Sequence, residues 1–411
     1  MTTMIKAILF DLDDTLLTNP ANEFVQHYKK ALLPLLTEAF PTLTVDKLEA
    51  GIINGIRSVI KNCDPLRLNS EVFYTAFHEV TDLSLADHQD LMKTFFEKVH
   101  PSLKQVTTPI ETAPLVVKWL LDHRYAVAVA TNPLFQHQAV EQRLEWACLP
   151  MPETGFWFVT SLDNMHYSKP WPHYYEEILT RLGFEPDEAV MVGDDWANDM
   201  VGASQAGLNT FWIRNHHNET VDIRQESVQP DGEGTLADFF RLITEENWLQ
   251  DLIPKPLVPN QIAPRMMGNI SALLGMVSDI PTHYWHQRPD PNEWSPMEIV
   301  VHLRDSESRV QRPRLERILH EDDPFLVPPP SPPRPGEQQL QGLDGTKVAL
   351  EFAAERAITL ELINGLSAEA WGRPARHSVF GPTSFLEMAS FTARHDRLHI
   401  NQLCQTLGKC E

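Results

Sequence analysis

Cysteine is scarce in this chain, which has four among 411 residues and no Cys-x-x-Cys pair. A disulfide framework is not expected in a long chain with so few cysteines, so the sequence predicts a reduced, cytoplasmic protein. No charged leader with a cleavage site precedes the first apolar run. The four cysteines are Cys63, Cys148, Cys404 and Cys410.

Long apolar runs and positive charge are scarce too. A membrane span needs about 18 apolar residues in a row, and the nearest candidate, 115–130, is broken by Lys118, Asp122, His123 and Arg124. Lys and Arg number 34 against 56 Asp and Glu, a formal net charge of −22. Duplex DNA needs clustered basic side chains, so we expect neither nucleic acid nor membrane as a partner. Phosphate esters are not excluded, because local sites and metals hold them.

The pattern of apolar runs predicts an α/β domain over residues 1–250. Strands that alternate with helices indicate a doubly wound parallel sheet, with ligands beyond the carboxyl ends of the strands. A stretch of helical periodicity after the first strand indicates an inserted helical cap at about 18–112, with helices at 24–40, 45–60 and 85–99. Further helices are expected at 115–122, 173–182 and 236–243. The expected strands are 5–10, 126–130, 156–159, 189–192 and 210–213.

A second, all-α domain is predicted at 262–411, after a proline-containing linker at 251–261. No strand signal is found beyond the linker. Ser295 with Glu298, and Ser384 with Glu387, have the spacing of helix capping boxes. The run 328–336 is proline-rich and is expected to form an extended loop. Four amphipathic helices, which predict a four-helix bundle, are expected at 261–280, 295–319, 346–366 and 384–406.

Carboxylates gather where two of the expected strands end. Asp11, Asp13 and Asp14 follow the first strand, and a matching cluster, Asp194, Asp195 and Asp199, follows the fourth. Buried carboxylates repel one another and normally require a cation. Both clusters project from the same edge of a parallel sheet, so together they can bind Mg²⁺. After the second and third strands come Thr131 and Asn132, which can donate to a phosphate oxygen, and Lys169, a positive charge for an anionic centre.

In this order, Asp-x-Asp-x-Thr, Thr, Lys and Gly-Asp-x-x-x-x-Asp resemble the signature of the haloacid dehalogenase (HAD) superfamily, over about residues 4–245. The resemblance implies a phosphatase in which Asp11 is the nucleophile and Asp13 the general acid and base. Thr131 would hold the phosphoryl group and Lys169 would steady its charge. The family's dehalogenases lack an acid at the place of Asp13, which favours phosphate chemistry. The implied Mg²⁺ site comprises Asp11, the Asp13 carbonyl and Asp194, with Asp195 and Asp199 in it or beside it.

Two alternatives accompany this interpretation. Residues 11–15 alone fit a turn and a helix cap, because Asp and Thr are frequent there. A phosphomutase shares Asp11 and Asp13 and transfers the phosphoryl group to a sugar phosphate.

The expected substrate is a small phosphorylated metabolite. The sequence of the cap does not identify which one. Arg57, Lys61 and Arg67 could meet an anionic substrate, but a solvated helix face is the stronger expectation.

Histidines are the candidate ligands of the second domain. His395 and His399 lie one turn apart on an expected helix, and His302 follows the Ser295 cap by two turns. This spacing suits Zn²⁺ or Ni²⁺ with an open coordination position. Over about 262–408 the chain resembles the DinB-like superfamily in 294–303, 380–382 and His395-Asp396-x-x-His399-x-x-Gln402, which implies these three ligands. His377 is a weaker candidate, and Trp285, Trp294 and Trp371 are expected in the core.

The predicted function is Mg²⁺-dependent hydrolysis of a phosphomonoester, with the bundle as a metal-binding accessory or second enzyme. The alternatives for the bundle are a non-catalytic dimerisation module, which allows for a homodimer, and a thiol-dependent transferase, which some members of the resembled superfamily are. Histidines without any metal, placed on a surface or in a core, are the remaining interpretation.

Overall fold

The computed structural model describes residues 4–84, 86–215, 218, 228–327 and 340–410. The chain divides into two compact units. The first comprises 1–175 and 184–256, and the second comprises 176–183 and 257–411. Among the described helices, none is both long enough and apolar enough to cross a lipid bilayer.

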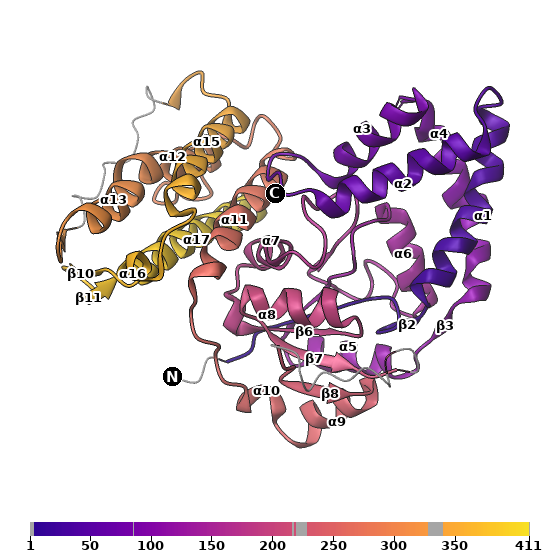
Figure 1. The fold of residues 1–411 in the computed structure, drawn as a ribbon, viewed down its shortest axis with the longest axis horizontal. Helices are drawn as coiled ribbons and strands as arrows, with labels where there is room; N and C mark the ends of the chain where they lie inside the picture. Colours follow the sequence, from indigo (N-terminus) through magenta and orange to yellow (C-terminus); the bar gives the residue numbers. More distant parts are fainter. Residues whose placement is uncertain (1–3, 85, 216–217, 219–227, 328–339, 411) are drawn as a thin grey trace. The chain divides into compact units, whose positions relative to one another are not determined.

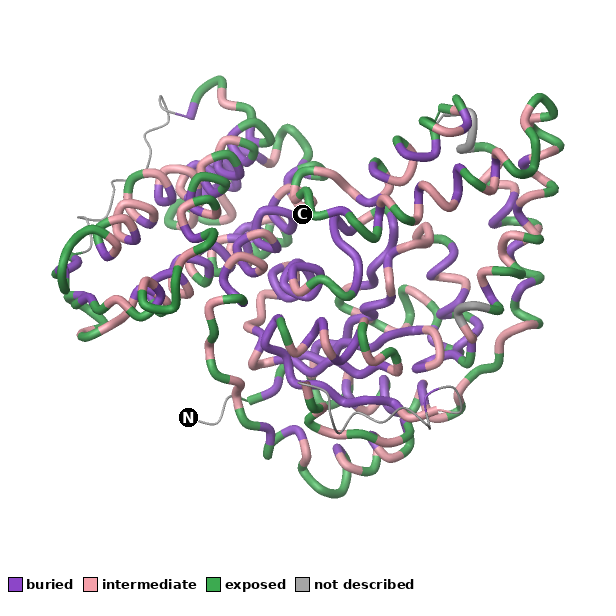
Figure 2. Tube along the Cα trace, viewed as in Figure 1, coloured by how far each residue is buried: buried purple, intermediate pink, exposed green. Residues whose placement is uncertain are grey.

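A six-stranded parallel sheet forms the core of the first unit (Figure 1). Its strand order is β5-β4-β1-β6-β7-β8, so β1 lies between β4 and β6. All residues of β1, β4, β6 and β7 are buried (Figure 2), as expected for strands covered on both faces. The strands are β1 (Ala7–Phe10), β4 (Ala126–Val129), β5 (Phe158–Val159), β6 (Ala189–Gly193), β7 (Asn209–Ile213) and β8 (Gly232–Gly234).

Helices cover both faces of this sheet, with α8 on the side opposite α9 and α10 in Figure 1. The doubly wound α/β fold is thereby confirmed, although the sixth strand, β8, was not predicted. Phe10, Phe211 and Phe239 pack edge to face in the core between the sheet and α9. The helices are α5 (Thr112–Asp122), α6 (His137–Trp146), α7 (Pro172–Leu182), α8 (Gly202–Ala206), α9 (Leu236–Glu245) and α10 (Trp248–Asp251), with η3 (Pro186–Glu188) and η4 (Trp196–Val201) between them.

The helical cap is inserted between β1 and β4. An antiparallel pair, β2 (Leu17–Thr18) with β3 (Thr108–Pro109), forms where the chain leaves the core and returns. The cap has its own apolar cluster and includes a helix, α3, that was not predicted. Its helices are α1 (Ala21–Ala39), α2 (Val45–Lys61), α3 (Asn69–Thr81), α4 (Ala86–Thr94), the π-helical η1 (Phe95–Val99) and the 3-10 helix η2 (His100–Val106).

The second unit is a four-helix bundle, as predicted. The helix expected at 295–319 is interrupted by a π-helical segment, η6, and becomes α12 and α13. Both capping boxes form, since Ser295 and Glu298, and Ser384 and Glu387, exchange backbone–side-chain hydrogen bonds. The bundle comprises α11 (Ile262–Val277), α12 (Pro296–Ser306), η6 (Glu307–Gln311), α13 (Arg312–His320), α15 (Gly345–Ile363) and α17 (Phe385–Cys410), with η5 (Pro259–Gln261) and α16 (Ala368–Trp371) as short additions.

One expectation for the second unit was wrong, because strands do occur beyond the linker. A three-stranded sheet of order β11-β10-β9 lies beside the bundle helices. β10 and β11 carry proline, glycine, arginine and histidine rather than alternating apolar residues, and β9 has only two residues, so no periodic signal marked these strands. The proline-rich run 328–336 lies outside the described residues. The strands are β9 (Phe325–Leu326), β10 (Pro374–His377) and β11 (Gly381–Ser384).

Candidate active site

The register of the sheet brings the ends of three strands together. Phe10 pairs with Val129 of β4 on one side and with Val192 of β6 on the other. Asp11 therefore leaves β1 level with the strand ends that lead to Thr131 and Asp194. In an open α/β sheet, this carboxyl edge is where ligands bind.

Three carboxylates meet at this edge. One oxygen from each of Asp11, Asp194 and Asp199 lies within 4.8 Å of the others. Gly193 permits the approach of Asp199, because a Cβ at Gly193 would lie 2.3 Å from Asp199 Oδ2. The close approach of Asp199 thus explains why glycine precedes Asp194 in the Gly-Asp motif.

Lys169 is the buried cation beside this cluster. Its Nζ lies 2.7 Å from Asp11 Oδ1 and 2.5 Å from Asp199 Oδ1. Burial alone would lower the pKa of Lys169, but Asp11 and Asp199 hold it well above its usual value. One ammonium cannot neutralise three carboxylates, so the ionised cluster has an excess of two negative charges.

The acidity of the carboxylates reflects this excess. Burial raises the pKa of Asp11 to about 8, with Lys169 opposing the rise and Asp199 adding to it. Burial, and then the charges of Asp11 and Asp199, raise the pKa of Asp194 to about 9. Converging buried carboxylate oxygens are the donors that a hard divalent cation prefers, and such a cation would offset their repulsion. The donor set therefore fits Mg²⁺.

Asp195 is the predicted ligand that the structure does not bring into the cluster. Its side chain is exposed, and Oδ1 accepts a hydrogen bond from the backbone N–H of Asn198 as the cap of η4. Its own backbone N–H donates to Asp199 Oδ2 at 3.0 Å. The cap competes for the carboxylate, so Asp195 orients Asp199 rather than joining the three oxygens.

Thr131 and Asn132 follow the end of β4. Thr131 is buried, and its carbonyl accepts hydrogen bonds from Thr160 Oγ1 at 2.8 Å and from the Tyr174 hydroxyl at 2.7 Å. These bonds fix the backbone at the strand end. Asn132 Oδ1 is buried and has no hydrogen-bond partner among the described residues, a state that usually indicates a ligand or water.

Asp13 is held by two donors that the sequence analysis did not identify. Arg143 Nη1 lies 2.5 Å from Asp13 Oδ2, and Asn19 Nδ2 donates to Oδ1 at 2.7 Å. Arg143 is fully buried on α6, with its guanidinium 4.7 Å from the centre of the Phe135 ring. No motif connects this arginine with an aspartate 130 positions earlier, so only the fold could reveal the pair.

Asp194 also has partners outside the predicted set. Asn215 Nδ2 donates to its Oδ2 at 2.9 Å, and Trp212 Nε1 donates to its carbonyl at 2.8 Å. Of the basic cap residues, Arg57 and Lys61 are exposed, and Arg67 donates to Thr75 Oγ1 at 3.0 Å. These contacts fit the expectation of a solvated helix face.

A second cluster lies within the bundle, where α12 contributes His302 and α17 contributes His395 and His399. One ring nitrogen from each lies within 4.8 Å of the others. The Nε2 atoms of His302 and His395 are 3.3 Å apart. A tetrahedral zinc ion holds its nitrogens about 3.3 Å apart, given metal–nitrogen bonds of roughly 2.0–2.1 Å. The spacing therefore fits a transition-metal ion.

The surroundings orient His399 and keep His302 and His399 neutral. His399 Nδ1 lies 2.9 Å from Gln402 Oε1, which directs Nε2 towards the cluster. Burial, and then the neighbouring histidines, lower the pKa of both His302 and His399 to about 4. Trp294, expected only in the core, also stacks against His399 with ring centres 5.9 Å apart.

Buried charges fix α17 beside the histidines. Arg356 Nη2 lies 2.6 Å from Asp396 Oδ2 and 2.8 Å from Glu307 Oε2. All three side chains are buried. His377, the weaker candidate, lies on β10 outside the cluster, and its Nδ1 accepts from the backbone N–H groups of Val379 and Phe380.

Comparison with known proteins matches two families. Residues 8–213 match the model of the haloacid dehalogenase-like hydrolases, and residues 268–403 match that of the DinB superfamily. The glyceraldehyde 3-phosphate phosphatase of Methanothermobacter thermautotrophicus is 26% identical over 245 residues, which is 59% of this chain and 99% of that protein. The pyrophosphatase PpaX of Bacillus cereus is 26% identical over 206 residues, 50% of this chain and 82% of that protein.

Among solved structures, the HAD phosphatase from Thermococcus onnurineus aligns with a TM-score of 0.39 and 23% identity, covering 58% of this chain and 98% of that one. The family match spans half of the sequence and includes Asp11, Thr131, Lys169 and Asp194. The chain belongs to the haloacid dehalogenase-like hydrolases, and its C-terminal part matches the DinB superfamily.

Proposed function

We propose that the first unit is a Mg²⁺-dependent phosphatase that hydrolyses phosphomonoesters through a phosphorylated Asp11. The observation that supports this most directly is the cluster of Asp11, Asp194 and Asp199, of which Asp11 and Asp199 contact the buried Lys169. Asp11, Asp194 and the Asp13 carbonyl would hold Mg²⁺, with Asp199 adjacent. When bound, the ion supplies positive charge that offsets the carboxylates and the phosphoryl oxygens.

In the first half of the proposed reaction, Asp11 attacks phosphorus. Lys169 occupies Oδ1, and no described residue donates a hydrogen bond to Oδ2, which is therefore the attacking oxygen. The bond from phosphorus to the ester oxygen breaks, and protonated Asp13 gives its proton to the departing alcohol. Thr131 and Lys169 hold the phosphoryl oxygens. Catalysis here is mainly positioning and charge neutralisation.

In the second half, water attacks the phosphorus of the acyl phosphate. Asp13 takes the proton of that water, and inorganic phosphate leaves as the Asp11 carboxylate is restored. In the structure both Asp13 oxygens accept hydrogen bonds, from Arg143 and Asn19, which suits its role as a base. For its role as an acid, one of these bonds must be released.

The test is phosphate release from a panel of phosphorylated metabolites with and without Mg²⁺. In H₂¹⁸O, hydrolysis incorporates one labelled oxygen into the phosphate, whereas the phosphomutase alternative gives an unlabelled phosphoryl group on a sugar. Asp11→Asn is expected to lose at least 99% of turnover, because the amide is a poor nucleophile. Retention of more than a tenth of the wild-type kcat, with circular dichroism unchanged, would exclude the covalent mechanism.

For the bundle we propose one transition-metal ion bound by His302, His395 and His399, with water in an open position. The spacing of the ring nitrogens and the Gln402 contact support this. The test is the metal content of protein purified without chelators and then offered Zn²⁺ or Ni²⁺. A protein that binds neither favours the dimerisation module, and metal with tight thiol binding favours the transferase.

A further inference from the structure

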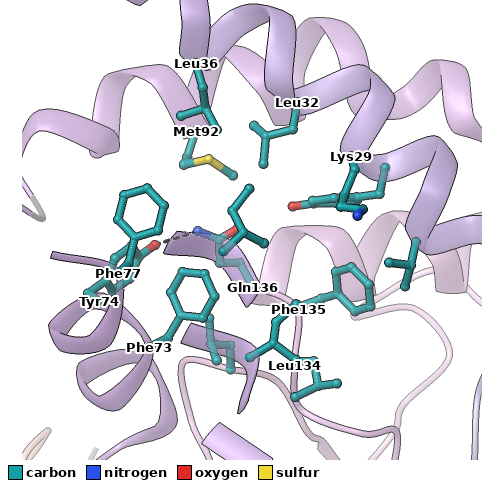
Figure 3. Close-up of a pocket in the computed structure, with 15 residues that line it drawn as sticks. Lys29, Leu32, Leu36, Phe73, Tyr74, Phe77, Met92, Leu134, Phe135 and Gln136 are labelled. Carbon is teal, nitrogen blue, oxygen red and sulfur yellow. Dashed lines mark hydrogen bonds between the residues drawn. The ribbon is translucent and has the colours of Figure 1, made fainter. Parts of the chain in front are cut away.

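An apolar cavity of about 220 Å³ lies between the cap helices and the core of the first unit. Its walls come from α1, α2, α3 and α4, and its floor comes from the loop 134–136 that follows the strand end at Thr131. Figure 3 shows Leu32 and Leu36 facing Phe73 and Phe77 across this space. The cavity thus lies between the cap and the segment that carries the candidate phosphate-binding residues.

The lining is predominantly apolar. Its polar side chains are Tyr28, Lys29, Tyr74 and Gln136. Gln136 Nε2 donates to the Tyr74 hydroxyl at 2.7 Å, and Lys29 forms an ion pair with Glu49. A charged or polyhydroxylated group placed here would exchange water for a hydrocarbon surface, which is unfavourable.

A short chain of contacts connects the cavity with the candidate acid. The Phe135 ring lines the cavity and lies 4.7 Å from the Arg143 guanidinium carbon. Arg143 in turn lies 2.5 Å from Asp13 Oδ2. One guanidinium therefore separates the cavity wall from the carboxyl group that protonates the leaving oxygen. The backbone N–H of Leu134, another lining residue, donates to the Asn132 carbonyl at 2.8 Å.

We propose that this cavity binds the leaving group of the substrate, and that the substrates are phosphomonoesters of apolar alcohols or phenols. The inference rests on the proposed phosphatase function, since Asp13 marks where the ester oxygen must lie. An apolar cavity of roughly 150 Å³ accommodates benzene, so this cavity accommodates a substituted ring or a chain of similar bulk. The pyrophosphate named for the relative PpaX has a charged leaving group, which this lining does not suit.

The test uses ethyl, butyl, hexyl and octyl phosphate with Mg²⁺. Their alcohols have similar acidity, so the chemical step is constant and kcat/KM reports burial of the chain. We expect kcat/KM to rise about fourfold per methylene until the cavity is full, from roughly 0.8 kcal/mol per buried methylene. Binding of the matching n-alkylphosphonates, which cannot be hydrolysed, should tighten by the same factor.

A matched pair of variants on α2 locates the effect. Ile56 lines the cavity, whereas Ile60, one turn further, is 39% exposed. Ile56→Trp fills the cavity and should abolish the dependence on chain length while ethyl phosphate is still hydrolysed. Ile60→Trp should retain the wild-type dependence.

The possible outcomes distinguish failure of this inference from failure of the proposed phosphatase function. Turnover of every ester without any effect of chain length overturns the inference and leaves the phosphatase standing. An effect that persists in Ile56→Trp also overturns it, because the apolar contact then lies elsewhere. No turnover, with phosphonates that still bind more tightly as they lengthen, overturns the phosphatase but supports the cavity as the ligand site. No turnover and no such tightening overturns both.

Discussion

His100 should make the cap sensitive to acid. It is fully buried on η2, and its Nδ1 lies 2.7 Å from Gln142 Oε1, which makes Nδ1 the protonated nitrogen. Nε2 is buried without a hydrogen-bond partner among the described residues, beneath the stacked ring of Trp146. Burial lowers the pKa of His100 to about 4, with Gln142 opposing this shift and Arg143 adding to it. A second proton would therefore create a buried, unpaired charge.

The magnitude follows from linkage. In the unfolded chain the pKa of histidine is about 6.5. Below that pH the unfolded state binds a proton at this histidine, whereas His100 in the folded state remains neutral. The stability contribution is complete above about pH 6.5 and is lost as the pH falls towards 4. Between pH 7.5 and 5, the two pKa values correspond to a loss of about 2 kcal/mol, or roughly thirtyfold in the opening equilibrium.

Hydrogen–deuterium exchange of the full chain measures this locally. Protection of peptides from 95–106, corrected for the intrinsic effect of pH, is compared at pH 7.5 and 5 for wild type and His100→Phe. Phenylalanine fits among the surrounding rings and loses one hydrogen bond, about 1 kcal/mol at either pH, so that loss cancels in the comparison. The variant should lose less than a quarter of the acid effect, whereas exposed His27→Phe should retain it. An unchanged acid effect in His100→Phe would refute the reasoning.

Three further predictions concern the two sites. Asp194→Ala should raise the Mg²⁺ concentration for half-maximal activity at least tenfold more than Asp195→Ala, because only Asp194 lies in the carboxylate cluster; equal shifts in a Mg²⁺ titration would contradict this. Arg143→Met should slow hydrolysis of alkyl phosphates at least tenfold more than that of 4-nitrophenyl phosphate, whose leaving group needs no acid; equal slowing would make Arg143 merely structural. His395→Ala should lower bound zinc from about one equivalent to below 0.2, with phosphatase rates unchanged; zinc content equal to wild type would rule out the site.

The strand ends could be predicted because central parallel strands are continuous apolar runs, and the carboxylates directly follow them. β8 escaped prediction since its sequence, Gly232-Glu233-Gly234, pairs on one edge only and carries no apolar side chain. The histidine pair on α17 followed from helical periodicity, and His302 from its distance to a capping box. Local periodicity therefore predicts the positions of residues whose interacting neighbours lie in the same helix or strand.

Arg143 shows where such reasoning ends. Its helix, α6, has a weak apolar face and was not predicted, so nothing in the sequence suggested that its arginine lies inside the protein. Burying a guanidinium is unfavourable unless a carboxylate and hydrogen bonds compensate for its desolvation. Asp13 provides that partner, and Phe24 and Phe135 cover the guanidinium planes. The contact depends on tertiary packing between residues 130 positions apart.

The two candidate sites differ in the chemistry of their donor atoms, and this difference would determine which metal ion each site binds. Oxygen donors such as Asp11, Asp194 and Asp199 suit hard ions, and the abundant cellular ion of this kind is Mg²⁺. Neutral imidazoles, which His302 and His399 remain well below neutral pH, bind zinc or nickel far more tightly than magnesium. A scarce transition metal would therefore occupy the histidines first and leave the carboxylates to Mg²⁺. One chain could thus hold two metal sites that do not compete, because the protein ligands of one are all oxygens and those of the other are all imidazole nitrogens.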